Sequence, residues 1–199
     1  MKSICVFGDS ISWGAWDTKR GGWVSRLWHH VAGREGDDYV EVYNLSVSGG
    51  TSRTILDRFE TEARIRNADA LIFQTGGNDA LYESDPAKLW VAPDQFRSTI
   101  ADIIVRAKAI TPHVLFCEVA NCDEAKTMPV SWGSYHYTNE NISRYVAIMK
   151  EVCESHGVPF LSLGPLDDSD FEDGLHPNAD GHEKIFRSMQ DFLLTHAWI

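Results

Sequence analysis

The sequence predicts an α/β fold in which a parallel sheet is covered by helices on both faces. Five short apolar runs recur along the chain, and amphipathic stretches separate them. Strands that alternate with helices form βαβ units, and such units build parallel sheets. The composition, 43% hydrophobic and 24% charged over 199 residues, is that of a globular chain large enough to bury a core. We therefore expect one domain over residues 1–199.

Five apolar runs predict the strands. Four of them are nearly continuous in apolar residues, which is typical of parallel strands that are buried on both faces. The second run is interrupted by Glu41 and Asn44. The predicted strands span residues 4–7, 39–45, 70–74, 114–119 and 158–163.

Apolar residues at helical spacing predict the helices between these strands. Trp28 belongs to the apolar stripe of the first helix, and His182 falls on that of the last, where we expect it to be packed. Proline or glycine ends several stripes, as at Pro112 and Gly157. The stripes span residues 23–31, 55–63, 96–107, 142–152 and 179–193.

Two segments do not follow this alternation. Residues 79–94 form a loop with two prolines, and residues 121–139 lack clear periodicity but are rich in aromatic side chains. A long loop in a compact domain is usually functional or disordered, and aromatic content argues against disorder. Both segments follow strands, and ligands of open α/β sheets bind at the carboxyl ends of strands. We therefore expect both loops to lie over the edge of the sheet that is formed by the carboxyl ends of the strands.

Charge and apolar patterning exclude several classes of protein. Eighteen basic and 29 acidic residues give a formal net charge of −11, and such an acidic surface repels the phosphates of nucleic acids. No apolar run approaches the ~20 residues that a membrane span needs. The N-terminal apolar run is too short for a secretory signal. We expect a cytoplasmic protein without nucleic-acid partners or a membrane span.

Metal and nucleotide motifs are also missing from the sequence. The acidic stretch 167–173 lacks the glycine of an EF-hand loop, and the zinc-protease-like motif that begins at His182 has no second histidine. Neither a Walker A sequence nor Gly-x-Gly-x-x-Gly occurs. The four cysteines form no CxxC pair, which favours free thiols. We expect no metal site and no cofactor.

Four polar, glycine-containing turns follow predicted strands, and parallel strands place such turns at one edge. A serine in the first turn, Ser10, becomes a nucleophile if a base takes its proton. His176 can be that base when a carboxylate holds its other ring nitrogen. Asp173 is three residues away and is favoured by this spacing. The competing carboxylates are Asp167, Asp168 and Asp170.

A tetrahedral oxyanion also needs preorganised hydrogen-bond donors. The backbone N–H groups of Ser10 and Gly49 and the side-chain amide of Asn78 are of the right type. The four turns that supply the nucleophile, the base with its carboxylate and these donors span residues 8–12, 44–51, 76–79 and 173–177.

In their order and separation these four turns resemble the four sequence blocks of the GDSL, or SGNH, hydrolases. The resemblance covers residues 7 to 177, with Ile11 where the family usually has leucine. It implies a flavodoxin-like three-layer α/β/α fold with a five-stranded parallel sheet. It also implies a cofactor-free Ser-His-Asp triad of Ser10, His176 and Asp173, with Ser10, Gly49 and Asn78 as the oxyanion hole.

We therefore expect a serine esterase that cleaves carboxylic esters, with short-chain or acetyl esters as the default small-molecule substrates. An acyltransferase that uses the same triad is one alternative, and a non-catalytic flavodoxin-like binding module is another. The α/β-hydrolase motif Gly-x-Ser-x-Gly is absent. Oligomeric state is not indicated by the sequence. Aromatic residues that could line a substrate pocket are Trp13, Trp16, Trp90, Trp132 and Tyr135, and His136 is the further histidine of interest.

Overall fold

The computed structural model describes residues 2–199 and contains a five-stranded parallel sheet in the order β2-β1-β3-β4-β5. All neighbouring strands pair in parallel, so the predicted sheet and its five strands are confirmed. The last strand is shorter than the predicted run 158–163. The strands are β1 (Lys2–Gly8), β2 (Val40–Asn44), β3 (Ala70–Gln74), β4 (His113–Cys117) and β5 (Phe160–Leu161).

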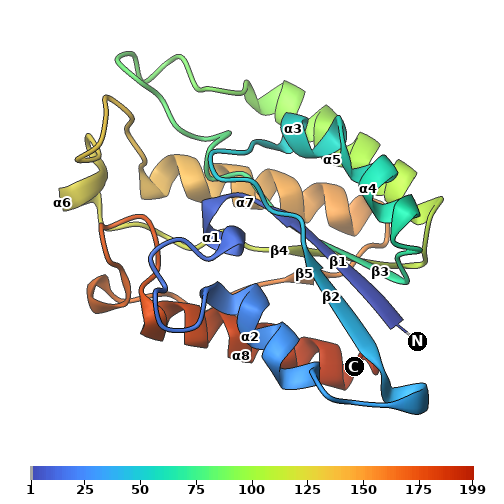
Figure 1. Ribbon diagram of the computed structural model, residues 1–199. Coiled ribbons are helices and arrows are strands. Elements are labelled where there is room, and N and C mark those ends of the chain that lie inside the picture. Colours follow the sequence, from blue (N-terminus) through green and yellow to red (C-terminus); the bar gives the residue numbers. More distant parts are fainter. Residues whose placement is uncertain (1) are drawn as a thin grey trace.

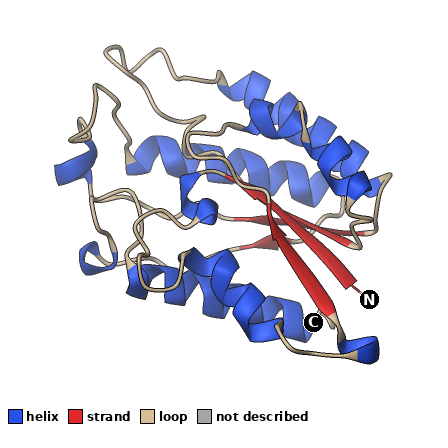
Figure 2. Cartoon of the chain, viewed as in Figure 1, coloured by secondary structure: helices blue, strands red, loops and turns tan. Residues whose placement is uncertain are grey.

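Helices cover both faces of the sheet (Figures 1 and 2). Helices α2 (Gly22–Val31) and α8 (Ala179–Thr195) pack together on one face, which confirms the predicted layers. The other face carries α3 (Ser52–Leu56), α4 (Phe59–Ile65), α5 (Pro93–Lys108) and α7 (Asn139–Ser155). The short helices are α1 (Ser10–Trp13), α6 (Glu124–Thr127) and the 3₁₀ turns Gly36–Asp38 and Asp168–Asp170.

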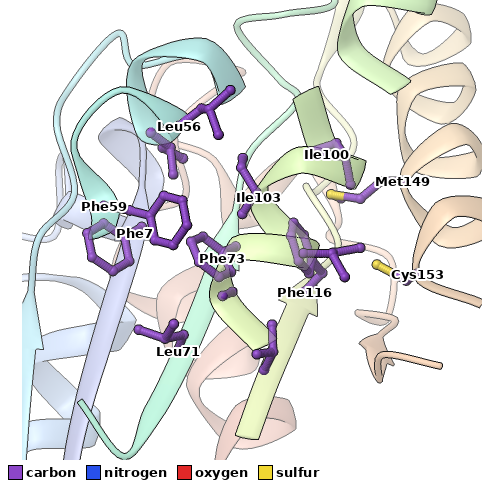
Figure 3. Packing of buried hydrophobic residues seen from close by; sticks show 14 of the residues in the cluster. Phe7, Leu56, Phe59, Leu71, Phe73, Ile100, Ile103, Phe116, Met149 and Cys153 are labelled. Atoms are coloured by element: carbon purple, nitrogen blue, oxygen red, sulfur yellow. The ribbon is translucent and has the colours of Figure 1, made fainter. Parts of the chain in front are cut away.

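Aromatic rings form the centre of the core on the α5 and α7 face (Figure 3). Phe73 of β3 stacks on Phe7 of β1 at 5.5 Å and on Phe116 of β4 at 5.0 Å between ring centroids. Phe59 of α4 meets Phe73 edge-on at 5.4 Å. Such pairs contribute about 0.5–1.5 kcal/mol each beyond the burial of their area. They hold the three central strands in register.

On the other face of the sheet, a buried glutamine links several elements near the carboxyl ends of the strands. Gln74, at the end of β3, accepts hydrogen bonds from Ser12 Oγ at 2.6 Å and from Trp23 Nε1 at 3.0 Å. Its amide nitrogen donates to the Glu118 carbonyl at 2.9 Å. A buried polar group is tolerated when its hydrogen bonds are made, as here. Gln74 therefore ties α1, α2 and the end of β4 to the centre of the sheet.

The structure differs from the sequence-based expectation in two places. The single helix expected over residues 55–63 is divided into α3 and α4, because residues 57 and 58 leave the helix between them. Trp28, expected in the buried stripe of α2, is 49% exposed and stacks edge-on against His29 instead. It lies one helical step past Leu27, beyond the strip that faces the core.

The expectations for His182 and for the cysteines are confirmed. His182 of α8 is fully buried, and the four cysteines are buried and free of disulfides. Within residues 2–199, no helix has both the length and the apolar character needed to cross a bilayer.

Candidate active site

Ser10 lies where β1 turns into α1. The Asp9 side chain accepts a hydrogen bond from the Ile11 N–H at 2.9 Å and so caps this helix, which makes Ser10 its first residue. Gly8 permits the tight turn, because an added Cβ would lie 2.5 Å from Ser12 Oγ. The turn presents the Ser10 hydroxyl at the carboxyl edge of the sheet.

Asp173 and His176 lie in the turn that precedes α8. The first carboxylate oxygen of Asp173 accepts the N–H groups of Leu175 at 3.0 Å and His176 at 2.8 Å. Its second oxygen accepts His176 Nδ1 at 2.7 Å. The turn needs Gly174, which has a φ of +91° and would carry a Cβ 2.6 Å from the Lys126 side chain of α6. Helix α6 thus buttresses the turn.

The three side chains form a continuous hydrogen-bonded series. Ser10 Oγ lies 2.9 Å from His176 Nε2. With its Nδ1 proton assigned to the Asp173 contact, the ring offers Nε2 as an acceptor for the serine hydroxyl. This is the geometry in which an imidazole can remove the proton of an attacking hydroxyl.

The pKa values of the two carboxylates at the site, Asp173 and Asp9, are shifted in opposite directions. Burial alone would raise the pKa of Asp173, but the hydrogen bonds and charge of His176 outweigh it and lower this pKa to about 2. Burial raises the pKa of Asp9 to about 6, partly offset by the Ile11 N–H and by His176. Asp173 is therefore ionised at neutral pH, as a partner for an imidazolium should be.

Donors converge opposite the serine. The Asn78 amide nitrogen donates one hydrogen to the Gly50 carbonyl at 2.9 Å, which leaves its second N–H free for a ligand. Its oxygen accepts the Tyr137 hydroxyl at 2.9 Å, and burial raises the pKa of Tyr137, so this donor stays protonated. The backbone N–H groups of Ser10 and Gly49 find no acceptor among residues 2–199.

A buried carboxylate holds two of these turns together. Asp79, next to Asn78, accepts the Ser52 hydroxyl at 2.5 Å and the Ser52 N–H at 3.0 Å. Burial raises the pKa of Asp79, and the Ser52 bonds oppose this. Because Ser52 lies three residues after Gly49, these bonds fix the Gly49 turn against the Asn78 turn.

A cavity of about 220 Å³ opens over Ser10 and His176. Trp90, Trp132 and Tyr135, all expected at the pocket, line it, and the Trp132 ring centroid lies 5.5 Å from that of His176. The remaining walls come from Ser48, Gly49, Asn78, Leu81, Tyr137 and Leu175. Larger hollows occur elsewhere, including one of about 400 Å³ beside Lys2 and Trp198, but they contain none of these polar groups.

Three residues expected at the pocket lie outside its lining. Trp13, at the end of α1, is 58% exposed. His136 stacks on Tyr82 at 4.8 Å, because residues 82 and 136 pair as an antiparallel bridge that turns the ring away. Trp16 lies behind the triad, where its indole nitrogen donates to Asp173 Oδ2 at 2.6 Å.

The sequence pattern did not single out Tyr137, Leu81, Leu175 or Ser48. Leu175 and Ser48 lie inside the polar turns 173–177 and 44–51, so their place in the sequence could have indicated that they line the cavity. Tyr137 is one of several aromatic residues in the segment 121–139, and only the path of that loop in the structure places it against Asn78.

This arrangement is typical of α/β serine hydrolases: a serine, a histidine and an aspartate are joined by hydrogen bonds, and amide donors converge beside them at the edge of a parallel sheet. The chain belongs to the GDSL-like lipase/acylhydrolase family, whose model matches residues 6–184, and it is a carboxylic ester hydrolase of that family. This family membership argues against the alternative of a non-catalytic binding module.

The chain is also similar to individual proteins. Esterase TesA of Pseudomonas aeruginosa is 28% identical over 190 residues, covering 94% of this chain and 86% of the relative. A crystal structure of TesA is 22% identical with a TM-score of 0.72, and covers 96% of this chain and 98% of that one. The acetylxylan esterase of Geobacillus stearothermophilus is 17% identical with a TM-score of 0.73, and the shared regions are 96% and 92% of the two chains. These structures share the fold.

Proposed function

We propose that the protein is a serine esterase in which Ser10 is the nucleophile, His176 the general base and Asp173 its orienting carboxylate. The Ser10–His176 contact of 2.9 Å, continued to Asp173 at 2.7 Å, carries this proposal. Ser10 Oγ attacks the ester carbonyl while its proton passes to His176 Nε2. The resulting oxyanion accepts hydrogen bonds from the N–H groups of Ser10, Gly49 and Asn78.

The intermediate then collapses and expels the alcohol, which takes the proton from His176. An acyl group remains on Ser10. Water attacks this acyl-enzyme, gives a proton to His176, and releases the carboxylic acid as Ser10 recovers its hydrogen. Asp173 stays ionised through both halves and stabilises the imidazolium that forms in each.

The substrates we propose are short-chain esters, such as acetyl esters. The cavity of about 220 Å³ is smaller than the ~300–1,000 Å³ that is usual for pockets holding drug-sized ligands. Trp132 and Trp90 stand on its walls, so a long acyl chain would have to displace large aromatic side chains. An acetyl or propionyl group needs far less of this volume than a long acyl chain does.

The test is hydrolysis of p-nitrophenyl esters from acetate to decanoate by the wild type and the Ser10→Ala variant. We expect kcat to fall at least ~10³-fold in Ser10→Ala and by less than about tenfold in Ser48→Ala, the matched control from the same cavity. Equal rates for the wild type and Ser10→Ala would overturn the mechanism. A kcat/KM that rises from acetate to decanoate would overturn the short-chain assignment.

A further inference from the structure

Trp16 stands in a loop whose neighbouring residues are both anchored. The carbonyl of Ala15 lies 3.2 Å from His182 Nε2 of α8. Burial lowers the pKa of His182 to about 4, so at neutral pH the ring is uncharged and can donate from Nε2. On the other side of Trp16, the buried carboxylate of Asp17 forms an ion pair with Arg26 of α2.

Asp17 organises the rest of the loop. Its carboxylate accepts three backbone N–H groups, those of Lys19, Arg20 and Gly22. Gly14 closes the base of the loop, because an added Cβ there would lie 2.1 Å from the Gly21 carbonyl oxygen. Buried contacts therefore fix the backbone on both sides of Trp16.

Trp16 itself has a left-handed backbone conformation, with a φ of +66°. This conformation is an outlier for a bulky side chain, and outliers of this kind persist only where the surrounding structure imposes them. The imposed conformation delivers the indole N–H to the Asp173 carboxylate at 2.6 Å. The ring meets His176 edge-on, with centroids 6.1 Å apart.

The indole and the imidazole donate to the same carboxylate oxygen. Asp173 Oδ2 accepts Trp16 Nε1 at 2.6 Å and His176 Nδ1 at 2.7 Å. The two nitrogens are 3.1 Å apart, but both carry hydrogens in the assigned tautomer, so their common partner is the oxygen. The other oxygen of Asp173 is occupied by the two backbone N–H groups of its own turn. The second donor on Oδ2 thus comes from Trp16.

We propose that Trp16 is a positioning residue that acts on the reaction through Asp173. The proposal rests on the proposed function of the triad. Two donors on one oxygen restrict rotation of the carboxylate, and with it the imidazole. The indole N–H also draws negative charge from the oxygen, which weakens its stabilisation of the imidazolium. Trp16 therefore keeps the imidazole of His176 in the orientation in which Nε2 faces the Ser10 hydroxyl.

The test is the Trp16→Phe variant, which keeps an aromatic ring and removes the N–H. The matched control is Trp13→Phe, an exposed tryptophan three residues earlier that makes no hydrogen bond to the triad. For Trp16→Phe we expect kcat to fall about tenfold with KM nearly unchanged. Trp13→Phe should leave both kcat and KM unchanged.

A second measurement does not depend on activity. The Nδ1–H proton of His176 should give a low-field proton resonance, which moves further downfield in Trp16→Phe because the oxygen then has one donor fewer. An unmoved resonance overturns the proposal. So does a Trp16→Phe variant that keeps the wild-type kcat, or one that raises KM alone. If Ser10→Ala remains active, the proposed function itself is wrong. If Ser10→Ala is inactive but Trp16→Phe behaves like the wild type, only the proposed role of Trp16 is wrong.

Discussion

The buried carboxylate of Asp9, beside the nucleophile, should make the stability of the fold depend on pH. Asp9 is 3% exposed and accepts the Ile11 N–H as the cap of α1. Burial raises its pKa from 3.8 to about 6, and the neighbouring Asp79 charge adds to the increase. Between these values the folded protein holds a proton that the unfolded chain has lost.

The sign and size of the effect follow from this difference. Because the folded pKa is the higher one, the contribution of Asp9 to stability falls as pH rises through the window between 3.8 and about 6. The raised pKa of Asp9 corresponds to about 3 kcal/mol at neutral pH and above. Most of this is lost between about pH 4 and about pH 8.

The Asp9→Asn variant tests this, because asparagine retains the capping oxygen but cannot ionise. The free energy of unfolding would be measured by urea denaturation at about pH 4 and about pH 8. We expect the stability of the variant relative to the wild type to improve by about 2 kcal/mol from the lower to the higher pH. The control Asp102→Asn, at an exposed position on α5, should show no such change. The same difference at both pH values for Asp9→Asn would refute the reasoning.

Two further substitutions probe the site and its supporting loop. Tyr137→Phe removes the donor to the Asn78 oxygen at 2.9 Å, and kcat on p-nitrophenyl acetate should fall roughly tenfold; an unchanged kcat contradicts this. Gly14→Ala places a Cβ 2.1 Å from a backbone oxygen, and scanning calorimetry should show a midpoint at least about 5 °C lower. Gly33→Ala, also at positive φ but in open space, should cost less; equal losses would refute the clash.

Periodicity alone predicted most of the fold. The five strands were recognisable because parallel strands buried on both faces leave nearly continuous apolar runs, and the long amphipathic helices left clear stripes. Local geometry limited the rest. The division between α3 and α4 comes from two residues that leave the helix, and Trp28 lies just outside a stripe that a linear pattern does not resolve.

The candidate site was predictable where topology brings turns together. Ser10, Gly49, Asn78 and the turn of Asp173 follow different strands, and a parallel sheet places all such turns at one edge. The aromatic surroundings were not predictable in the same way. Trp16 reaches Asp173 only through a left-handed backbone held by buried contacts, and His136 turns away through its pairing with residue 82.

The serine and the histidine that meet at 2.9 Å are separated by 166 residues of chain. During synthesis at about 5–20 residues per second, roughly ten to thirty seconds pass between their appearance. The strands β1, β2 and β3 are neighbours in the sheet and are also the first three made, so three of the five strands can pair on the ribosome while the site is still incomplete. Ester cleavage therefore reports a long-range contact that forms only once the turn of Asp173 and His176 has joined the sheet, and refolding followed by activity should lag behind refolding followed by tryptophan fluorescence.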